Sequence, residues 1–149
     1  MGVRGCRGGP GTIVRNAVLV MHGTGGTGTQ FIRAEFAGEL FRAGGVLDAS
    51  RYFIIIPDGI GHGGSQPRLA TDCHRCHPQR LLFAVNSADD LVNPPELGIL
   101  EREIKRVPKG RAVVVPMSTE TRGHGTHTIA AVWKNYLEEL LSISGALKH

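Results

Sequence analysis

The stretch AVLVMHGTGGTG, residues 17–28, decides the fold. It begins with five consecutive apolar residues, a run that is typical of a strand buried on both faces of a parallel sheet. A glycine-rich turn follows from His22 to Gly28, and apolar residues at roughly helical spacing come next. The stretch therefore predicts a strand, a tight turn and a helix, which together open a βαβ unit.

The same alternation continues along the chain. The predicted strands are runs of apolar residues at 17–21, 52–56, 81–85 and 111–116. The three predicted long helices lie at 30–42, 94–107 and 126–141. Because alternating strands and helices indicate a parallel sheet with helices on both faces, we expect an α/β three-layer sandwich of about four mostly parallel strands.

Composition excludes several classes of protein. The chain has 149 residues, 41% of them hydrophobic and 20% charged, which suits one globular domain over 16–149 after a flexible tail at 1–15. No apolar run approaches the roughly 20 residues of a membrane helix, and no secretory h-region is present, so we expect a cytoplasmic location and no membrane partner. The net charge of +4 comes from scattered Lys and Arg, which argues against nucleic-acid binding.

An irregular junction at 59–80 interrupts the pattern, and so long a structureless connection suggests that a segment is missing there. It contains Cys73, Cys76 and His77 in a C-x-x-C-H pattern. Haem attachment by this pattern needs export, and a structural zinc ion needs a second ligand pair that is not evident. We therefore expect no metal and no cofactor, and a metal-dependent hydrolase that uses this Cys/His cluster stays as an alternative.

Four loops, each after a predicted strand, carry the candidate chemistry. They read HGTGGTG at 22–28, PDGIGHGGS at 57–65, NSADDLVNPPE at 86–96 and RGHGTH at 122–127. In this order and with this wording, they resemble the loops of the α/β-hydrolase superfamily, in particular its homoserine O-acetyltransferase-like branch. The resemblance covers residues 16–67 and 81–142.

The resemblance implies a role for individual residues. Asp90 with Pro94 matches the family's D-x-x-x-P pattern, which makes Asp90 rather than Asp89 the triad acid. His124 follows Gly123 directly and corresponds to the triad histidine, with His127 the weaker candidate. The residues Gly23, Thr24 and Gly25 correspond to the oxyanion loop, where closely spaced glycines let backbone amides converge on developing negative charge.

The nucleophile of the family is missing. Members of the family place a G-x-S-x-G elbow, a further strand and a lid between the second and third loops, and this chain contains no G-x-S-x-G. The nearest sequence is GGSQP at 63–67, so Ser65 is the candidate substitute nucleophile. Loss of a triad nucleophile costs on the order of a million-fold in turnover, although binding and oxyanion contacts leave about 10³-fold over water.

We therefore expect weak hydrolysis of a small acyl ester or lactone, or weak acyl transfer, with His124 acting as a general base on water. One alternative is a folded fragment without catalysis, in which Asp90 and His124 are simply inherited. Another is a dinucleotide-binding module that uses G-x-G-x-x-G at 23–28 with Asp58 after the next strand. Since the strands lost from the family's sheet lie between the first two and the last two, open edges predict a homo-oligomer.

Overall fold

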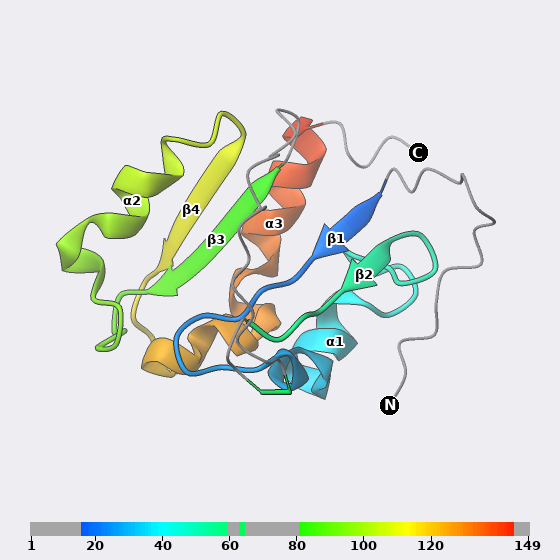
Figure 1. Cartoon of the computed structure of the whole chain (residues 1–149), viewed down its shortest axis with the longest axis horizontal. Helices are drawn as coiled ribbons and strands as arrows, with labels where there is room; N and C mark the ends of the chain where they lie inside the picture. The colour runs from blue at the N-terminus through cyan, green and yellow to red at the C-terminus, as the bar shows by residue number, and fades with distance from the viewer. Residues whose placement is uncertain (1–15, 60–62, 65–80, 145–149) are drawn as a thin grey trace.

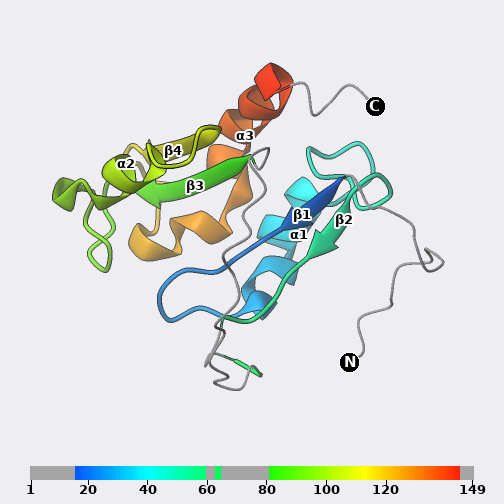
Figure 2. The same ribbon diagram turned by 45° about the horizontal axis from the view of Figure 1, so that its top comes forward.

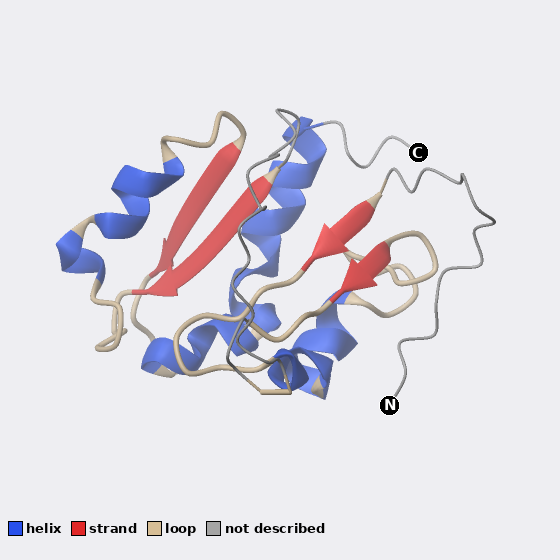
Figure 3. Cartoon of the chain, in the orientation of Figure 1, coloured by secondary structure: helices blue, strands red, loops and turns tan. Residues whose placement is uncertain are grey.

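The computed structural model describes residues 16–59, 63–64 and 81–144, and alternates short strands with helices (Figure 1). The strands are β1 (Ala17–Leu19), β2 (Phe53–Ile55), β3 (Leu82–Ser87) and β4 (Gly110–Val115). The α-helices are α1 (Ala34–Leu40), α2 (Ile99–Ile104) and α3 (Ala130–Ser144), and the 3₁₀ helices are η1 (Gly28–Ile32), η2 (Pro95–Leu97) and η3 (Gly123–Thr128). Figure 3 separates helix from strand by colour.

The strands form two parallel pairs. β1 pairs with β2 from Ala17 opposite Phe53, and β3 pairs with β4 over the whole of both strands. The α/β class with parallel strands is therefore confirmed, but the described residues contain two sheets of two strands each instead of one sheet of four. In Figure 1, β1 and β3 are the inner strands, and β2 and β4 lie on the outer sides. No described strand lies between β1 and β3, so side chains and not backbone hydrogen bonds connect the two sheets.

The predicted long helices are broken, and among the described helices only α3, with 15 residues, is long. The helix expected at 30–42 is interrupted at Arg33, which is extended with φ −74° and ψ 157°. The helix expected at 94–107 is interrupted at Gly98, whose φ of 59° is a left-handed conformation that glycine tolerates best. The last helix begins at Ala130, after the 3₁₀ turn that carries His124. In each case a 3₁₀ turn precedes the α-helix.

The core lies where α1 and α3 meet the strands. Trp133 of α3 lies between Phe36 of α1 and Phe83 of β3, with ring centroids 5.7 and 5.8 Å apart. Figure 2 shows α1 on the side of β1 and β2, and α3 on the side of β3 and β4. The buried apolar side chains are Phe31, Phe36, Leu40, Leu47, Val113, Val115, Ala130, Trp133, Leu137 and Leu141. Trp133 therefore connects the two sheets through one aromatic cluster.

Strand burial differs from the expectation for β1 and β2. Val18 and Ile54 are packed against the core, whereas Leu19 and Ile55 are 56% and 39% exposed. The prediction that the first strand is buried on both faces is thus wrong, because α1 and α3 cover only one face. None of the helices within the described residues is long and apolar enough to cross a membrane.

Several predictions fall on residues that the structure does not describe. The tail at 1–15, most of the junction at 59–80, and the candidate nucleophile Ser65 lie outside the described residues. The same holds for the Cys/His cluster formed by Cys73, Cys76 and His77.

Candidate active site

Three of the four loops meet at the carboxyl ends of the strands. The loop after β3 carries Asp90, and the loop after β4 leads into η3 with His124. The glycine turn that follows β1 lies against the same imidazole, since a Cβ added at Gly23 would be 3.9 Å from His124 Cε1. Because parallel strands end on the same side of a sheet, residues far apart in the chain converge here.

Asp90 and His124 form a hydrogen-bonded pair, with Oδ2 of Asp90 2.9 Å from Nδ1 of His124. The other carboxylate oxygen of Asp90 accepts the backbone amides of Val92, at 2.8 Å, and Asn93, at 3.0 Å. Asp90 is only 4% exposed. Burial acts to raise the pKa of Asp90, but the hydrogen bonds from Asn93, His124 and Val92 outweigh it and lower the pKa below the ordinary value. The carboxylate that pairs with the histidine is the one that the D-x-x-x-P pattern selected.

The second nitrogen of His124 faces the glycine turn. Nε2 lies 3.0 Å from the carbonyl oxygen of Thr24, so both ring nitrogens meet acceptors. This arrangement favours the imidazolium, which donates from both nitrogens. The hydrogen bond to Asp90 raises the pKa of His124, burial opposes this, and the Thr24 carbonyl raises it further. In the described part of the chain, Nε2 therefore contacts a backbone carbonyl and no hydroxyl group.

The glycine turn also leaves amides available. Gly25 has a φ of 73°, and the turn is closed by the amide of Gly26, which donates to the carbonyl of Gly23 at 3.2 Å. Among the described residues, no acceptor lies within hydrogen-bond reach of the amides of Gly23, Thr24 and Gly25. These are the three residues that the resemblance assigns to the oxyanion loop, and their amides can meet a negatively charged oxygen.

The other two histidines of the site hold backbone in place. His22 accepts the amide of Gly59 on Nε2 at 2.7 Å, so its Nδ1 carries the proton and donates to the carbonyl of Gly23 at 2.9 Å. His127 Nδ1 donates to the carbonyl of His124 at 2.5 Å, and Gln30 lies 3.2 Å from its Nε2. Burial lowers the pKa of His127, which keeps this ring neutral. His127 thus supports the loop that carries His124.

Asp58 fastens the glycine turn to the end of β2. Its Oδ1 accepts the amide of Gly28 at 2.7 Å, and its Oδ2 accepts the amide of Gly64 at 2.8 Å. A dinucleotide-binding protein uses the acid at this position for ribose hydroxyls. Because both oxygens of Asp58 already hold backbone amides of the fold, the geometry argues against that alternative.

Asp89 is the residue of the site to which sequence reasoning gave no role. Its Oδ2 accepts the amide of Gly123 at 2.9 Å and faces the hydroxyl of Thr121 at 3.0 Å, and its Oδ1 accepts the hydroxyl of Ser87. The signal in the sequence is the pair of adjacent carboxylates, Asp89 and Asp90, of which a triad needs only one.

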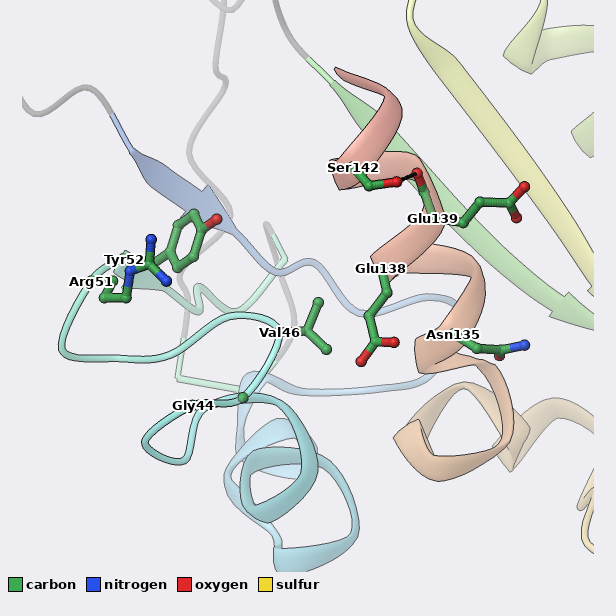
Figure 4. A pocket seen from close by; sticks show the side chains of 9 residues that line it. Gly44, Val46, Arg51, Tyr52, Asn135, Glu138, Glu139 and Ser142 are labelled. Atoms are coloured by element: carbon green, nitrogen blue, oxygen red, sulfur yellow. Dashed lines mark hydrogen bonds between the residues drawn. The ribbon is translucent and has the colours of Figure 1, made fainter. Parts of the chain in front are cut away.

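Neither of two cavities that the described residues form has Asp90 or His124 in its wall. The larger, of about 530 Å³, lies between the segment at 44–52 and the polar face of α3, with Tyr52, Glu138 and Ser142 in its wall (Figure 4). The smaller, of about 230 Å³, borders Gly28 and Asp58 at the end of the glycine turn. Within the described ranges, no three His, Cys, Asp or Glu side chains are grouped so that they could hold a metal ion.

Comparison with known proteins adds no relative: no family model, no curated protein and no solved structure matches this chain.

Proposed function

We propose that this protein is a weak hydrolase for small activated acyl esters or lactones of the cytoplasm, in which His124 activates water. The observation that carries the proposal is the hydrogen bond between buried Asp90 and His124, next to the glycine turn with its available amides. An acid and a histidine in this arrangement form two of the three parts of an acyl-transfer site. The third part, a hydroxyl nucleophile, has no counterpart at Nε2 of His124 among the described residues, and Ser65 lies outside them. In this proposal water takes that place.

The chemical steps use residues of this chain alone. Neutral His124 takes a proton from water on Nε2 as the water oxygen bonds to the acyl carbon, and Asp90 stabilises the imidazolium that forms. The carbonyl oxygen becomes an oxyanion and accepts the amides of the turn at Gly23, Thr24 and Gly25. The oxyanion then re-forms the carbonyl, the bond to the alcohol oxygen breaks, and His124 returns the proton to the leaving alcohol.

The contact between His124 and Thr24 limits this activity. Nε2 points at the Thr24 carbonyl, at 3.0 Å, so the glycine turn must move aside before a water molecule can reach the nitrogen. The same contact supports a second candidate, a protein without catalysis in which His124 cross-links the glycine turn to Asp90. Under either candidate function, we expect far lower turnover than for a protein with a complete triad.

We also propose that the chain is a truncated α/β-hydrolase, with strands removed from the middle of its sheet. The arrangement of Figure 1 supports this, since β1 and β3 face the middle of the molecule and no described strand pairs with both. In the family that the loops resemble, the lost strands lie at that place. The finer expectation of a three-layer sandwich belongs to this proposal.

Hydrolysis of p-nitrophenyl acetate and of an acyl lactone tests the function. Purified wild type is compared with His124→Ala and with Asp48→Asn, a carboxylate that holds the loop at 44–50 and has no contact with His124. We expect His124→Ala to abolish the activity, and Asp48→Asn and a chelator to leave it unchanged. Activity equal in wild type and His124→Ala would refute the role of His124, and silencing by chelator would favour the Cys/His cluster instead. No hydrolysis above buffer in wild type would leave the protein without catalysis.

A further inference from the structure

Asp89 and Asp90 are consecutive, and each binds one of two consecutive residues in the loop that carries the histidine. Asp89 Oδ2 accepts the amide of Gly123 at 2.9 Å, and Asp90 Oδ2 accepts the ring of His124 at 2.9 Å. One carboxylate thus holds the backbone just before His124, while the next holds its side chain. If Asp90 alone held the ring, the backbone of His124 would remain free to move.

Asp89 is itself held in place. Its Oδ1 accepts the hydroxyl of Ser87, the last residue of β3, which is 1% exposed. The hydrogen bond from Ser87 is the main cause that lowers the pKa of Asp89, so the carboxylate is ionised at neutral pH. The long pairing of β3 with β4 fixes Ser87, and through it the position of Asp89.

The backbone of the histidine loop approaches Asp89 closely. Gly123 has a φ of 54°, and a Cβ added there would lie 3.1 Å from the carbonyl oxygen of Asp89. The site therefore needs a residue without a side chain before His124, in a left-handed conformation that only glycine adopts readily. The close approach of Gly123 to Asp89 therefore helps to fix the position of the next residue, His124.

We propose that Asp89 is a positioning residue, which sets the ring of His124 against Asp90 by holding the amide of Gly123. It does not touch substrate, and its effect on hydrolysis rests on the proposed function. Its effect on the position of the His124 ring is independent of the proposed function. A misplacement of about 1 Å in a catalytic group costs up to about a hundredfold in rate, which gives a backbone hydrogen bond this leverage.

The titration of His124 in the 149-residue chain tests the proposal without any activity assay. The groups that face this ring are Asp90, the carbonyl of Thr24, the amide of Asn93 at 3.3 Å and the ring of His127 at 5.4 Å. Of these, the hydrogen bond to Asp90 contributes most to the raised pKa. Loosening the ring from Asp90 therefore moves the titration of His124 to lower pH.

NMR titration of the histidine rings is measured in wild type, Asp89→Ala, Asp89→Asn and Asp48→Ala. We expect Asp89→Ala to shift the midpoint of His124 to lower pH. Asp89→Asn, whose oxygen still accepts the Gly123 amide, should restore most of the wild-type value. Asp48→Ala is the matched control, since Asp48 also holds backbone amides of a loop but lies away from the ring. An unchanged midpoint in folded Asp89→Ala would overturn the proposal.

If Asp89→Ala does not fold, Ser87→Ala tests the same positioning role of Asp89. This nearly isosteric change releases one oxygen of Asp89 and keeps the backbone of β3, so we expect a smaller shift of His124 in the same direction. An unchanged titration midpoint of His124 in Ser87→Ala would also overturn the proposal. Where wild type hydrolyses esters, Asp89→Ala should lower kcat about tenfold to a hundredfold with little change in KM. A wild type without hydrolysis refutes the proposed function and leaves the NMR result to decide on Asp89.

Discussion

The two strand pairs of this molecule differ in length and in what they contribute to the site. β1 and β2 have three residues each, whereas β3 and β4 have six each and pair along their whole length. The longer pair carries both Asp90 and His124 in the loops that follow it. The shorter pair contributes the glycine turn, which accepts a hydrogen bond from His124 through the carbonyl of Thr24. The acid and the base therefore follow the same pair of strands, the one with the longer ladder of hydrogen bonds.

The two pairs are held together mainly by side chains. Trp133 contacts Phe36 on one side and Phe83 on the other, and Lys134 of α3 forms an ion pair with Glu39 of α1 at 2.5 Å. Both side chains of this ion pair are about one-third exposed, so water and salt screen the pair and reduce its contribution. The aromatic cluster is therefore the main connection between the halves, and the site depends on it indirectly.

The largest effect should come from breaking that connection. Trp133→Ala removes a side chain that is 4% exposed, and we expect it to lower the free energy of unfolding by about 3–5 kcal/mol. Trp133→Phe should cost less, because the indole nitrogen has no hydrogen-bond partner among the described residues. Denaturant unfolding measures both. Ile143→Ala, at a 74% exposed position of the same helix, is the control and should change stability by less than about 0.5 kcal/mol.

Alanine substitutions at two glycines, Gly123 and Gly98, distinguish the cost of backbone strain from disturbance of the site. Gly123 and Gly98 have φ values of 54° and 59°, so alanine at either position should cost about 1–2 kcal/mol in strain. Nothing lies within 4 Å of a Cβ at Gly98, whereas a Cβ at Gly123 meets the carbonyl of Asp89 at 3.1 Å. We expect Gly123→Ala to be the less stable variant and to perturb the NMR signals of His124. Equal stabilities and an undisturbed His124 would show that the close approach does not matter.

The pH dependence of stability should separate His124 from His127. The pKa of His124 is raised above its ordinary value of 6.5, so its contribution to stability is complete below pH 6.5 and is lost as pH rises through the raised value. The pKa of His127 is lowered, so the folded state loses stability as pH falls below 6.5. Unfolding free energies of wild type and His124→Gln over a pH series test this. Their difference should shrink above pH 6.5, and a difference that grows there would contradict the sign.

The smallest effect on stability, and the one that tests association, concerns the exposed face of β1. Leu19 is 56% exposed, and the predicted homo-oligomer would cover such apolar side chains. We expect Leu19→Lys to leave unfolding nearly unchanged and to shift sedimentation toward the monomer. A wild type that sediments as a monomer at all concentrations would contradict the prediction of an oligomer.

The sequence by itself determined the parallel α/β class and the places of the four strands. Asp90 and His124, selected through the resemblance, lie within hydrogen-bond distance of each other. Apolar runs mark the strands, and the D-x-x-x-P pattern of the family that the loops resemble favours Asp90 over Asp89. The helices were predicted less well, since Arg33 and Gly98 change the chain direction inside patterns that are otherwise helical. Backbone conformation at a single residue leaves no trace in hydrophobic periodicity.

Only the tertiary structure decided how these parts meet. It divides the strands into two pairs, turns Nε2 of His124 toward Thr24, and assigns Asp89 to the amide of Gly123. The last two of these contacts join residues that are 100 and 34 positions apart in the chain. Such contacts arise from packing around Trp133 and from the hydrogen-bond needs of buried backbone, which local sequence patterns do not encode.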